Sequence, residues 1–215
     1  MTYNYRNLAV AKEAIRSAGA DIAAGALPAA FGPMIFVFTG DGHVTRGAEE
    51  VFEQLPHKWV KPSELATLVS SGKHDNNVVY GVRVVDADYI VQKADGQPMT
   101  DKADYRKNPH LYESMFHTKI APYATAIMNG IYWDARYPRL LTNEQARALA
   151  PGRLVGVADI SCDVEGSLEF MRKVTDLDEP FFVYNAREDS ISSECELILG
   201  TFFVLTDRFF FSKLA

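Results

Sequence analysis

Two glycines one residue apart, Gly40 and Gly42, directly follow Thr39 and the apolar run from Met34 to Phe38. Backbone N–H groups that such a turn exposes at the start of a helix can bind the pyrophosphate of a dinucleotide. The apolar run predicts a strand buried on both faces, and a helix is expected after the turn because apolar residues recur at i, i+3, i+4 and i+7. These residues are Ala48, Val51, Phe52 and Leu55. Strand, glycine turn and helix in this order are typical of the opening of a nucleotide-binding unit.

The glycine pattern departs from the dinucleotide fingerprint G-x-G-x-x-G at its third position. Thr45 stands where the third glycine would be, and Gly47 follows two residues later. We expect Gly40 to make the tight turn and Gly42 to let a phosphate approach the backbone, whereas Gly47 eases the contact of helix and strand. On the motif alone, a nucleotide site and a plain structural turn remain equal alternatives.

The composition predicts a globular chain. Its 215 residues are 47% hydrophobic and 23% charged, enough to bury a core, and the net charge of −6 argues against nucleic acid or an anionic membrane as a partner. Cys162, Cys195 and five scattered histidines have no metal-ligand spacing, so no metal site is expected. The apolar run from Leu197 to Leu205 is too short to span a bilayer.

Apolar runs and breakers predict alternating helices and strands. A helix or two are expected in Leu8–Ala30, short helices in Asp101–Phe116, a capped helix from Thr142, and strands at His57–Val60, Val78–Val85, Tyr89–Gln92, Ala124–Trp133, Leu154–Ser161 and Phe181–Tyr184. The two runs around Asp86-Ala87-Asp88 form either a hairpin or two short strands. We therefore predict an α/β fold, a Rossmann-like parallel sheet with helices on both faces. Ligands of such sheets bind beyond the carboxyl ends of the strands, where polar residues or glycines occur at 40–45, 129–134 and 159–163.

Several motifs, in the same order and spacing, resemble lysine-ketoglutarate reductase, the saccharopine-forming half of aminoadipic semialdehyde synthase. The matching segments are Tyr3–Asn7, Val37–Ala48, Asp104-Tyr105, His110–Tyr112, Ile120–Tyr123, Asn129–Trp133, Pro138–Thr142, Asp159–Ser161 and Gly166–Met171. Together they cover about residues 3 to 194. This family is itself similar to alanine dehydrogenase and to the NAD(H)-binding subunit of transhydrogenase, in which a dinucleotide-binding lobe is inserted into a catalytic lobe.

The resemblance implies reductive condensation of L-lysine with 2-oxoglutarate to saccharopine, with hydride transfer from NADPH to an imine. The alternative is a non-catalytic dinucleotide-binding or assembly module. The resemblance also implies a mitochondrial location, with the cytoplasm as the alternative, and homo-oligomerisation of the full-length protein is left open. We expect a fragment that lacks most of the catalytic lobe: 1–30 as a linker helix, 31–165 as the dinucleotide-binding domain, and 166–215 as the start of the return to that lobe, with a tail unlike the family.

The resemblance also assigns site residues. Gly40, Gly42 and Thr45 correspond to pyrophosphate contacts, and the family has serine at the position of Thr45. Asn129 and Ile131 fall where related dehydrogenases pass a strand end beside the ribose and nicotinamide, whereas Tyr132 and Trp133 are expected to pack. Asp163 matches an aspartate near substrate and nicotinamide, so it is the expected catalytic residue; the alternative is a helix N-cap.

The form of the cofactor is predicted from the end of the second strand. NAD-specific sites usually carry a carboxylate there, about 20 residues beyond the glycine turn. This chain has Lys61 and Ser63 instead, which suit a 2′-phosphate, although Glu64 would reach the ribose after a small shift in register. NADPH is therefore the expected cofactor, with NADH as the alternative.

Overall fold

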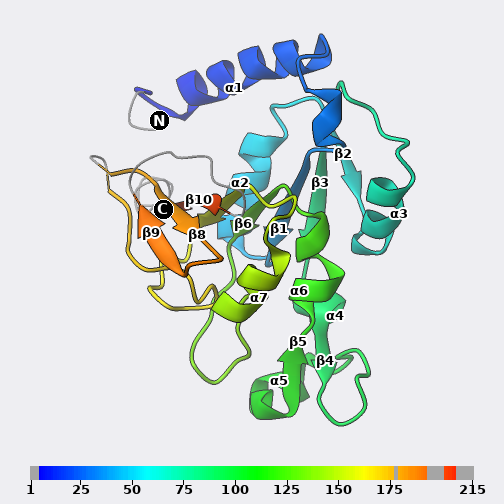
Figure 1. Ribbon diagram of the computed structural model, residues 1–215, viewed down its shortest axis with the longest axis vertical. Helices are drawn as coiled ribbons and strands as arrows, with labels where there is room; N and C mark the ends of the chain where they lie inside the picture. The colour runs from blue at the N-terminus through cyan, green and yellow to red at the C-terminus, as the bar shows by residue number, and fades with distance from the viewer. Residues whose placement is uncertain (1–4, 177–178, 193–200, 207–215) are drawn as a thin grey trace.

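An eight-stranded sheet forms the centre of the chain in the computed structural model, which describes residues 5–176, 179–192 and 201–206 (Figure 1). Its order is β2-β3-β1-β6-β7-β10-β8-β9. The strands are β1 (Ile35–Thr39), β2 (His57–Val60), β3 (Val79–Val84), β6 (Ala126–Asn129), β7 (Gly156–Asp159), β8 (Phe182–Asn185), β9 (Ser190–Ser192) and β10 (Thr201–Thr206). The first six strands in this order, β2-β3-β1-β6-β7-β10, run parallel to one another. The last two, β8 and β9, are each antiparallel to their neighbours. The predicted Rossmann-like α/β fold is confirmed.

The central strand β1 is buried on both faces, as its unbroken apolar sequence predicts. Ile35 and Val37 belong to one core cluster, and Phe38 belongs to a second cluster on the other face. Residues that alternate along a strand point to opposite faces, so a continuous apolar run needs a cover on each side. β1 also pairs with β3 on one side and with β6 on the other, which places its end in the middle of the parallel part of the sheet.

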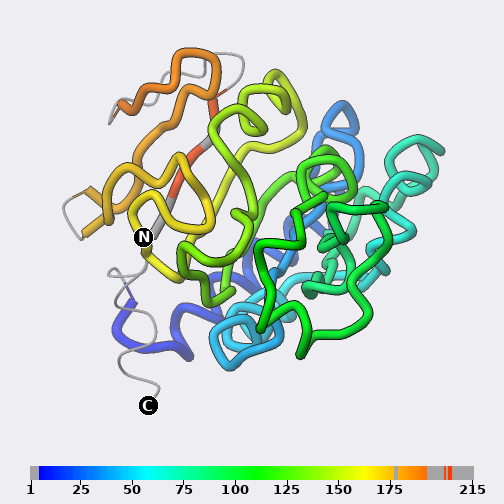
Figure 2. The backbone as a smooth tube through the Cα atoms, turned by 90° about the horizontal axis from the view of Figure 1, so that it is seen from below, coloured from blue at the N-terminus to red at the C-terminus, as the bar shows by residue number. Residues whose placement is uncertain are grey.

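Helices supply the cover on both faces, and Figure 2 shows α2 and α7 on opposite sides of the sheet. On one face α2 (His43–Phe52) places Phe52 against Phe38 and Trp59. The helix α1 (Leu8–Ala23) contacts α2 and the segment after it through an ion pair between Lys12 and Glu50 and a hydrogen bond from Arg16 to Gln54. The other face is covered by α3 (Leu65–Ser70), α6 (Phe116–Lys119) and α7 (Asn143–Leu149). Short 3-10 turns are η2 (Ala29–Phe31), η3 (Pro62–Glu64) and η5 (Ala121–Tyr123).

A small second sheet lies beyond the carboxyl edge of the large one, at the bottom of Figure 1. It consists of β4 (Ile90–Gln92) and β5 (Tyr112–Ser114), with α4 (Asp86–Tyr89), α5 (Lys102–Lys107) and η4 (Pro109–Leu111) beside them in the sequence. The hairpin alternative for 78–92 is therefore wrong, because β3 and β4 belong to different sheets. The expected pair of short helices in 101–116 is present as α5 and η4, but the last part of this range contains the strand β5.

Two predicted strands are shorter than expected. The run 124–133 is a strand only over Ala126–Asn129, and 154–161 only over Gly156–Asp159. The predicted capping box is present at α7: the Thr142 hydroxyl accepts from the Gln145 backbone, and the Gln145 side chain accepts from the Thr142 backbone.

Strand β10 lies between β7 and β8, so residues 201–206 of the tail are part of the same sheet as β1. The division of the chain at 30 and 165 stays a prediction. Within the described residues, no helix combines the length and the apolar character needed to span a bilayer.

Candidate functional site

A cleft of about 310 Å³ opens where β1, β3 and β6 end. These strands are neighbours and parallel, so their carboxyl ends lie together at one edge of the sheet. The lining comes from four segments, namely Gly40–Gly42, Val85-Asp86 with Tyr89, Lys102 with Tyr105-Arg106, and Gly130–Trp133 with Tyr137-Pro138. The predicted position of the ligand site at a sheet edge therefore corresponds to a real cavity.

Gly40 makes the tight turn at the end of β1. Its φ is 94°, a left-handed conformation that favours glycine, and its N–H donates to the Val84 carbonyl over 3.0 Å. A Cβ at this position would lie 3.1 Å from the Thr45 hydroxyl and 3.2 Å from the Gly130 carbonyl. The turn thus ties the end of β1 to the end of β3, and a side chain at Gly40 would be tightly crowded as well as strained.

Gly42 is the N-cap of α2, and the space beside it is open. A Cβ built there meets no atom within 4 Å, and its φ of −82° is ordinary for any residue. No side chain of the described residues caps the first turn of α2, whose backbone N–H groups lack partners inside the helix. This arrangement fits an anionic group such as a pyrophosphate, because free N–H groups and the helix dipole both favour negative charge.

Thr45 does not face the cleft, contrary to its predicted contact with phosphate. The residue is 2% exposed, and its hydroxyl donates to the Thr39 carbonyl over 2.9 Å. A Cβ at Gly130 would lie 2.5 Å from that hydroxyl oxygen, so the two residues are in close contact. The hydroxyl holds the first turn of α2 against the end of β1, and its single proton is already donated.

Asn129 is likewise placed inside the protein and not at the cofactor surface. It has no exposed area, and its carbonyl oxygen accepts from the Thr39 hydroxyl over 2.7 Å. Its amide donates to Asp159 Oδ1 and to Ser167 Oγ, each over 2.9 Å. The side chain is fully buried in this network across the ends of β1, β6 and β7, so it presents no exposed group for the predicted hydrogen bond to the ribose.

Asp159 is the fully buried carboxyl that accepts the hydrogen bond from Asn129. Its Oδ1 accepts from Asn129 and from the Ser161 hydroxyl, whereas the buried Oδ2 has no hydrogen-bond partner among the residues that the structure describes. Burial raises the pKa of this carboxyl, and the nearby charge of Asp163 adds to the increase. Hydrogen bonds from Ser161 and Asn129 work in the opposite direction but do not outweigh the desolvation.

Asp163, the predicted catalytic residue, lies exposed in the turn after β7 and is not among the residues that line the cleft. Its alternative role as a helix N-cap is not observed either, because the backbone N–H of Gly166 donates to its carbonyl in a turn and no helix begins there. A Cβ at Gly166 would come within 2.5 Å of the Asp163 side chain, so the turn is tight.

Lys61 and Ser63 also lie away from the cleft. They follow β2, which is the edge strand, and β3 lies between β2 and β1. Both residues are exposed, and the backbone N–H of Lys61 donates to the Glu64 carboxylate over 2.7 Å. The prediction that they bind a 2′-phosphate assumed that the second strand is the neighbour of the first. The strand next to β1 is β3.

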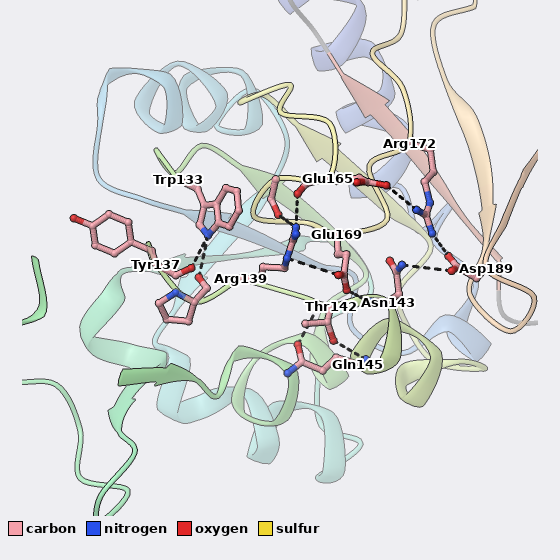
Figure 3. A network of polar contacts seen from close by, with 12 residues as sticks. Trp133, Tyr137, Arg139, Thr142, Asn143, Gln145, Glu165, Glu169, Arg172 and Asp189 are labelled. Carbon is pink, nitrogen blue, oxygen red and sulfur yellow. Dashed lines mark hydrogen bonds and ion pairs between the residues drawn. The ribbon is translucent and has the colours of Figure 1, made fainter. Parts of the chain in front are cut away.

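Ile131 is brought to the cleft as predicted, together with Gly40 and Gly42. Tyr132 was expected to pack but is 85% exposed at the cleft wall. Trp133 is fixed by its indole N–H, which donates to the carbonyls of Tyr137 and Pro138, and the Arg139 guanidinium lies over its ring (Figure 3).

The close-up in Figure 3 shows that Arg139 joins this wall to the segment after β7. The guanidinium donates to the backbone carbonyls of Glu165 and Gly166, and it lies 3.8 Å from the Glu169 carboxylate. Glu169 in turn accepts from the backbone N–H of Asn143 at the start of α7. These contacts connect Trp133 in the cleft lining to α7, and Arg139, Glu169 and Asn143 are not among the lining residues.

The residues that sequence reasoning missed are Asp86, Lys102 and Arg106. All three line the cleft, and the Lys102 ammonium lies 3.4 Å from Asp86 and 3.9 Å from Asp41. Asp86 was interpreted only as part of a turn, although it follows the apolar run 78–85 directly. The available signal was the same as for Gly40, a polar residue at the end of a buried strand.

Curated proteins with similar sequences share one name. The chain is 40% identical over 212 aligned residues to the α-aminoadipic semialdehyde synthase of Mus musculus, named mitochondrial, and 41% identical over 212 to that of Bos taurus, also named mitochondrial. The synthase of Arabidopsis thaliana is 40% identical over 200 residues. These matches cover 91%, 91% and 88% of this chain but only 22%, 22% and 19% of the relatives. No protein-family model matches. The resemblance to aminoadipic semialdehyde synthase is confirmed, for a chain that spans about a fifth of such a protein.

Proposed function

We propose that this chain is the dinucleotide-binding part of an oxidoreductase of lysine degradation that joins L-lysine and 2-oxoglutarate into saccharopine. The observation that carries the proposal is the cleft beyond β1, where Gly40 and Gly42 leave the first turn of α2 open. The similarity to aminoadipic semialdehyde synthases supports the pathway, and their names support a mitochondrial location.

A reduced nicotinamide dinucleotide fits the groups that line this cleft. The open space at Gly42 and the uncapped N–H groups of α2 suit the pyrophosphate. Ile131, which lies beside the Gly40 turn, and Trp133 offer apolar and aromatic surface in the lining. When bound, the cofactor supplies a hydride to the carbon of an imine between the lysine amine and the ketone carbon of 2-oxoglutarate, whose formation releases water.

The part of this chain in the reaction is to bind and orient the hydride donor. Asp163 is exposed and outside the cleft lining, so the expected proton transfer by this residue has no support from its position. Transfer of a hydride also requires the imine to be held against the nicotinamide, and such positioning contributes on the order of 7–11 kcal/mol in favourable intramolecular cases. We assign that task to parts of the full-length protein outside this chain.

The placement of Asp163 also favours a second candidate, a module that binds the dinucleotide without chemistry. The two candidates differ in the full-length protein. Oxidation of the reduced cofactor that depends on both lysine and 2-oxoglutarate supports the reductase, whereas binding without turnover supports the module.

The 215-residue chain alone is expected to bind a reduced dinucleotide but not to turn over. Binding is measured by calorimetry and by the fluorescence of the nicotinamide ring, and turnover by absorbance in the presence of both substrates. Turnover above a blank without enzyme would contradict the division of labour proposed here. The absence of any dinucleotide binding would contradict the assignment of the cleft.

A further inference from the structure

The end of β3 occupies the position beside the glycine turn. Thr39 and Val84 are register partners in β1 and β3, and the Gly40 N–H donates to the Val84 carbonyl over 3.0 Å. Asp86 stands two residues beyond that carbonyl and lines the same cleft as Gly40 and Gly42. In the common dinucleotide-binding sheet of order 3-2-1-4-5-6, the acidic residue that bonds the ribose 2′-hydroxyl follows the second strand, which lies beside the strand of the glycine turn. In this chain β3 holds that neighbouring position, and Asp86 follows it.

The carboxylate of Asp86 is anchored. Its side chain is 28% exposed, the Tyr89 hydroxyl donates to Oδ1 over 3.4 Å, and the Lys102 ammonium lies 3.4 Å from Oδ2. Burial and the charge of Asp86 raise the pKa of the Tyr89 phenol well above its usual value, so this neighbour remains a neutral donor. Asp86 therefore presents an acceptor at a fixed place in the cleft wall.

We propose that Asp86 binds the adenosine ribose through its 2′-hydroxyl and makes this site select NADH over NADPH. The inference rests on the proposed function and reverses the cofactor form predicted from Lys61 and Ser63. A carboxylate accepts a hydrogen bond from the 2′-hydroxyl of NADH but repels the 2′-phosphate of NADPH.

The positive groups of the cleft do not remove this repulsion. Among the described residues, its lining holds two cations, Lys102 and Arg106, and two carboxylates, Asp41 and Asp86, so these four charges cancel. Lys102 is already shared between Asp41 and Asp86. If Lys102 moved to a 2′-phosphate, it would leave Asp86 as an unpaired charge next to that phosphate. The described lining thus carries no surplus positive charge to balance a phosphorylated ribose.

The test is the ratio of the two dissociation constants for NADPH and NADH, measured on the 215-residue chain by calorimetry and nicotinamide fluorescence. We expect NADH to bind at least tenfold more tightly. Asp86→Asn, which keeps the size of the side chain, is expected to lower the ratio at least fivefold. Glu113→Gln, an exposed residue of β5 outside the cleft lining, removes the same charge and should leave the ratio unchanged.

The outcomes distinguish dinucleotide binding in the cleft from the selectivity attributed to Asp86. If neither dinucleotide binds, the cleft assignment and the proposed function are both overturned. If NADPH binds as tightly as NADH or more tightly, or if folded Asp86→Asn keeps the wild-type ratio, the role of Asp86 is overturned and the proposed function stands. The wild-type ratio needs no substitution, so an Asp86 variant that does not fold leaves the inference testable.

Discussion

The carboxyl edge of the sheet has two regions that look alike in sequence and differ in structure. At the ends of β1 and β3, Gly40, Gly42 and Asp86 open onto a cleft. At the ends of β6 and β7, Asn129 and Asp159 are fully buried and bonded to one another. In both regions a polar residue or a glycine follows an apolar strand. The difference teaches that such a residue marks a ligand site only where its polar groups are not already satisfied by neighbouring strands.

The strongest way to test this contrast is to remove the centre of the closed region. Asn129→Leu should lower the free energy of unfolding by about 3–4 kcal/mol, because the hydroxyls of Thr39 and Ser167 and the carboxyl of Asp159 lose a buried partner. Urea unfolding followed by circular dichroism measures the loss.

The matched control is Gln97→Ala, which truncates an exposed amide in a turn and should change the free energy of unfolding by less than about 0.5 kcal/mol. An Asn129→Leu protein as stable as the wild type, with weakened dinucleotide binding, would instead place Asn129 at the cofactor surface.

The two glycines of the turn provide the next comparison, within the open region itself. Gly42→Val should weaken the binding of the preferred dinucleotide more than tenfold, because its side chain would occupy the open space before the first turn of α2. The cost in stability should stay at about 0.5–1 kcal/mol, the usual range for an N-cap position.

Gly40→Ala should show the opposite balance, since its φ of 94° strains any side chain, at a cost of about 1–3 kcal/mol in the free energy of unfolding. Calorimetric titration and urea unfolding of both variants give the two numbers. Unchanged affinity in a folded Gly42→Val protein would remove the pyrophosphate from this turn.

The sequence predicts local features of this protein better than features that depend on sheet order. The apolar run 34–38, the glycine turn and the Thr142 capping box depend on local preferences, and each was predicted correctly. Sheet order depends on contacts between segments far apart in the chain, so the sequence could not show that β3, and not β2, lies beside β1. Lys61 was for that reason placed at the ribose, and Asp86 was missed. The use of the Asn129 and Thr45 side chains inside the protein depends on the same long-range placement.

Thr45 offers a smaller test at the boundary between the two regions. Thr45→Val keeps the shape of the side chain and removes the bond to the Thr39 carbonyl, which should cost about 1 kcal/mol in stability. Dinucleotide affinity should change less than about threefold, because the hydroxyl does not line the cleft. Thr45→Ser, which keeps the hydroxyl, serves as the control for binding. A tenfold loss of affinity in Thr45→Val that Thr45→Ser does not show would restore the predicted phosphate contact.

The smallest expected effect is a change of stability with pH. The carboxyls of Asp159 and Asp134 should contribute to it with opposite signs. Burial raises the pKa of Asp159 in the folded protein above its value of about 3.8 in the unfolded chain. The folded state therefore binds more protons in this window, and the contribution of Asp159 to stability falls as pH rises from about 4 through the folded pKa. In Asp134, beside the cleft wall, hydrogen bonds from Arg136 lower the pKa to about 2, so its contribution is present above about pH 4 and is lost as pH falls toward 2.

Urea unfolding of the wild type, Asp159→Asn and Asp134→Asn between pH 2 and 7 separates these two signs. The wild-type free energy of unfolding minus that of Asp159→Asn should decrease as pH rises above about 4. The buried carboxyl of the wild type holds its proton more tightly in the folded state than in the unfolded state, and the variant has no such group. The same difference for Asp134→Asn should increase between about pH 2 and 4 and then stay level. If the Asp159 difference increased with pH like that of Asp134, the carboxylate would be the favoured form in the folded protein. The hydrogen bonds from Asn129 and Ser161 would then outweigh the desolvation of this carboxylate, and the contrast between the two regions would lose its electrostatic support.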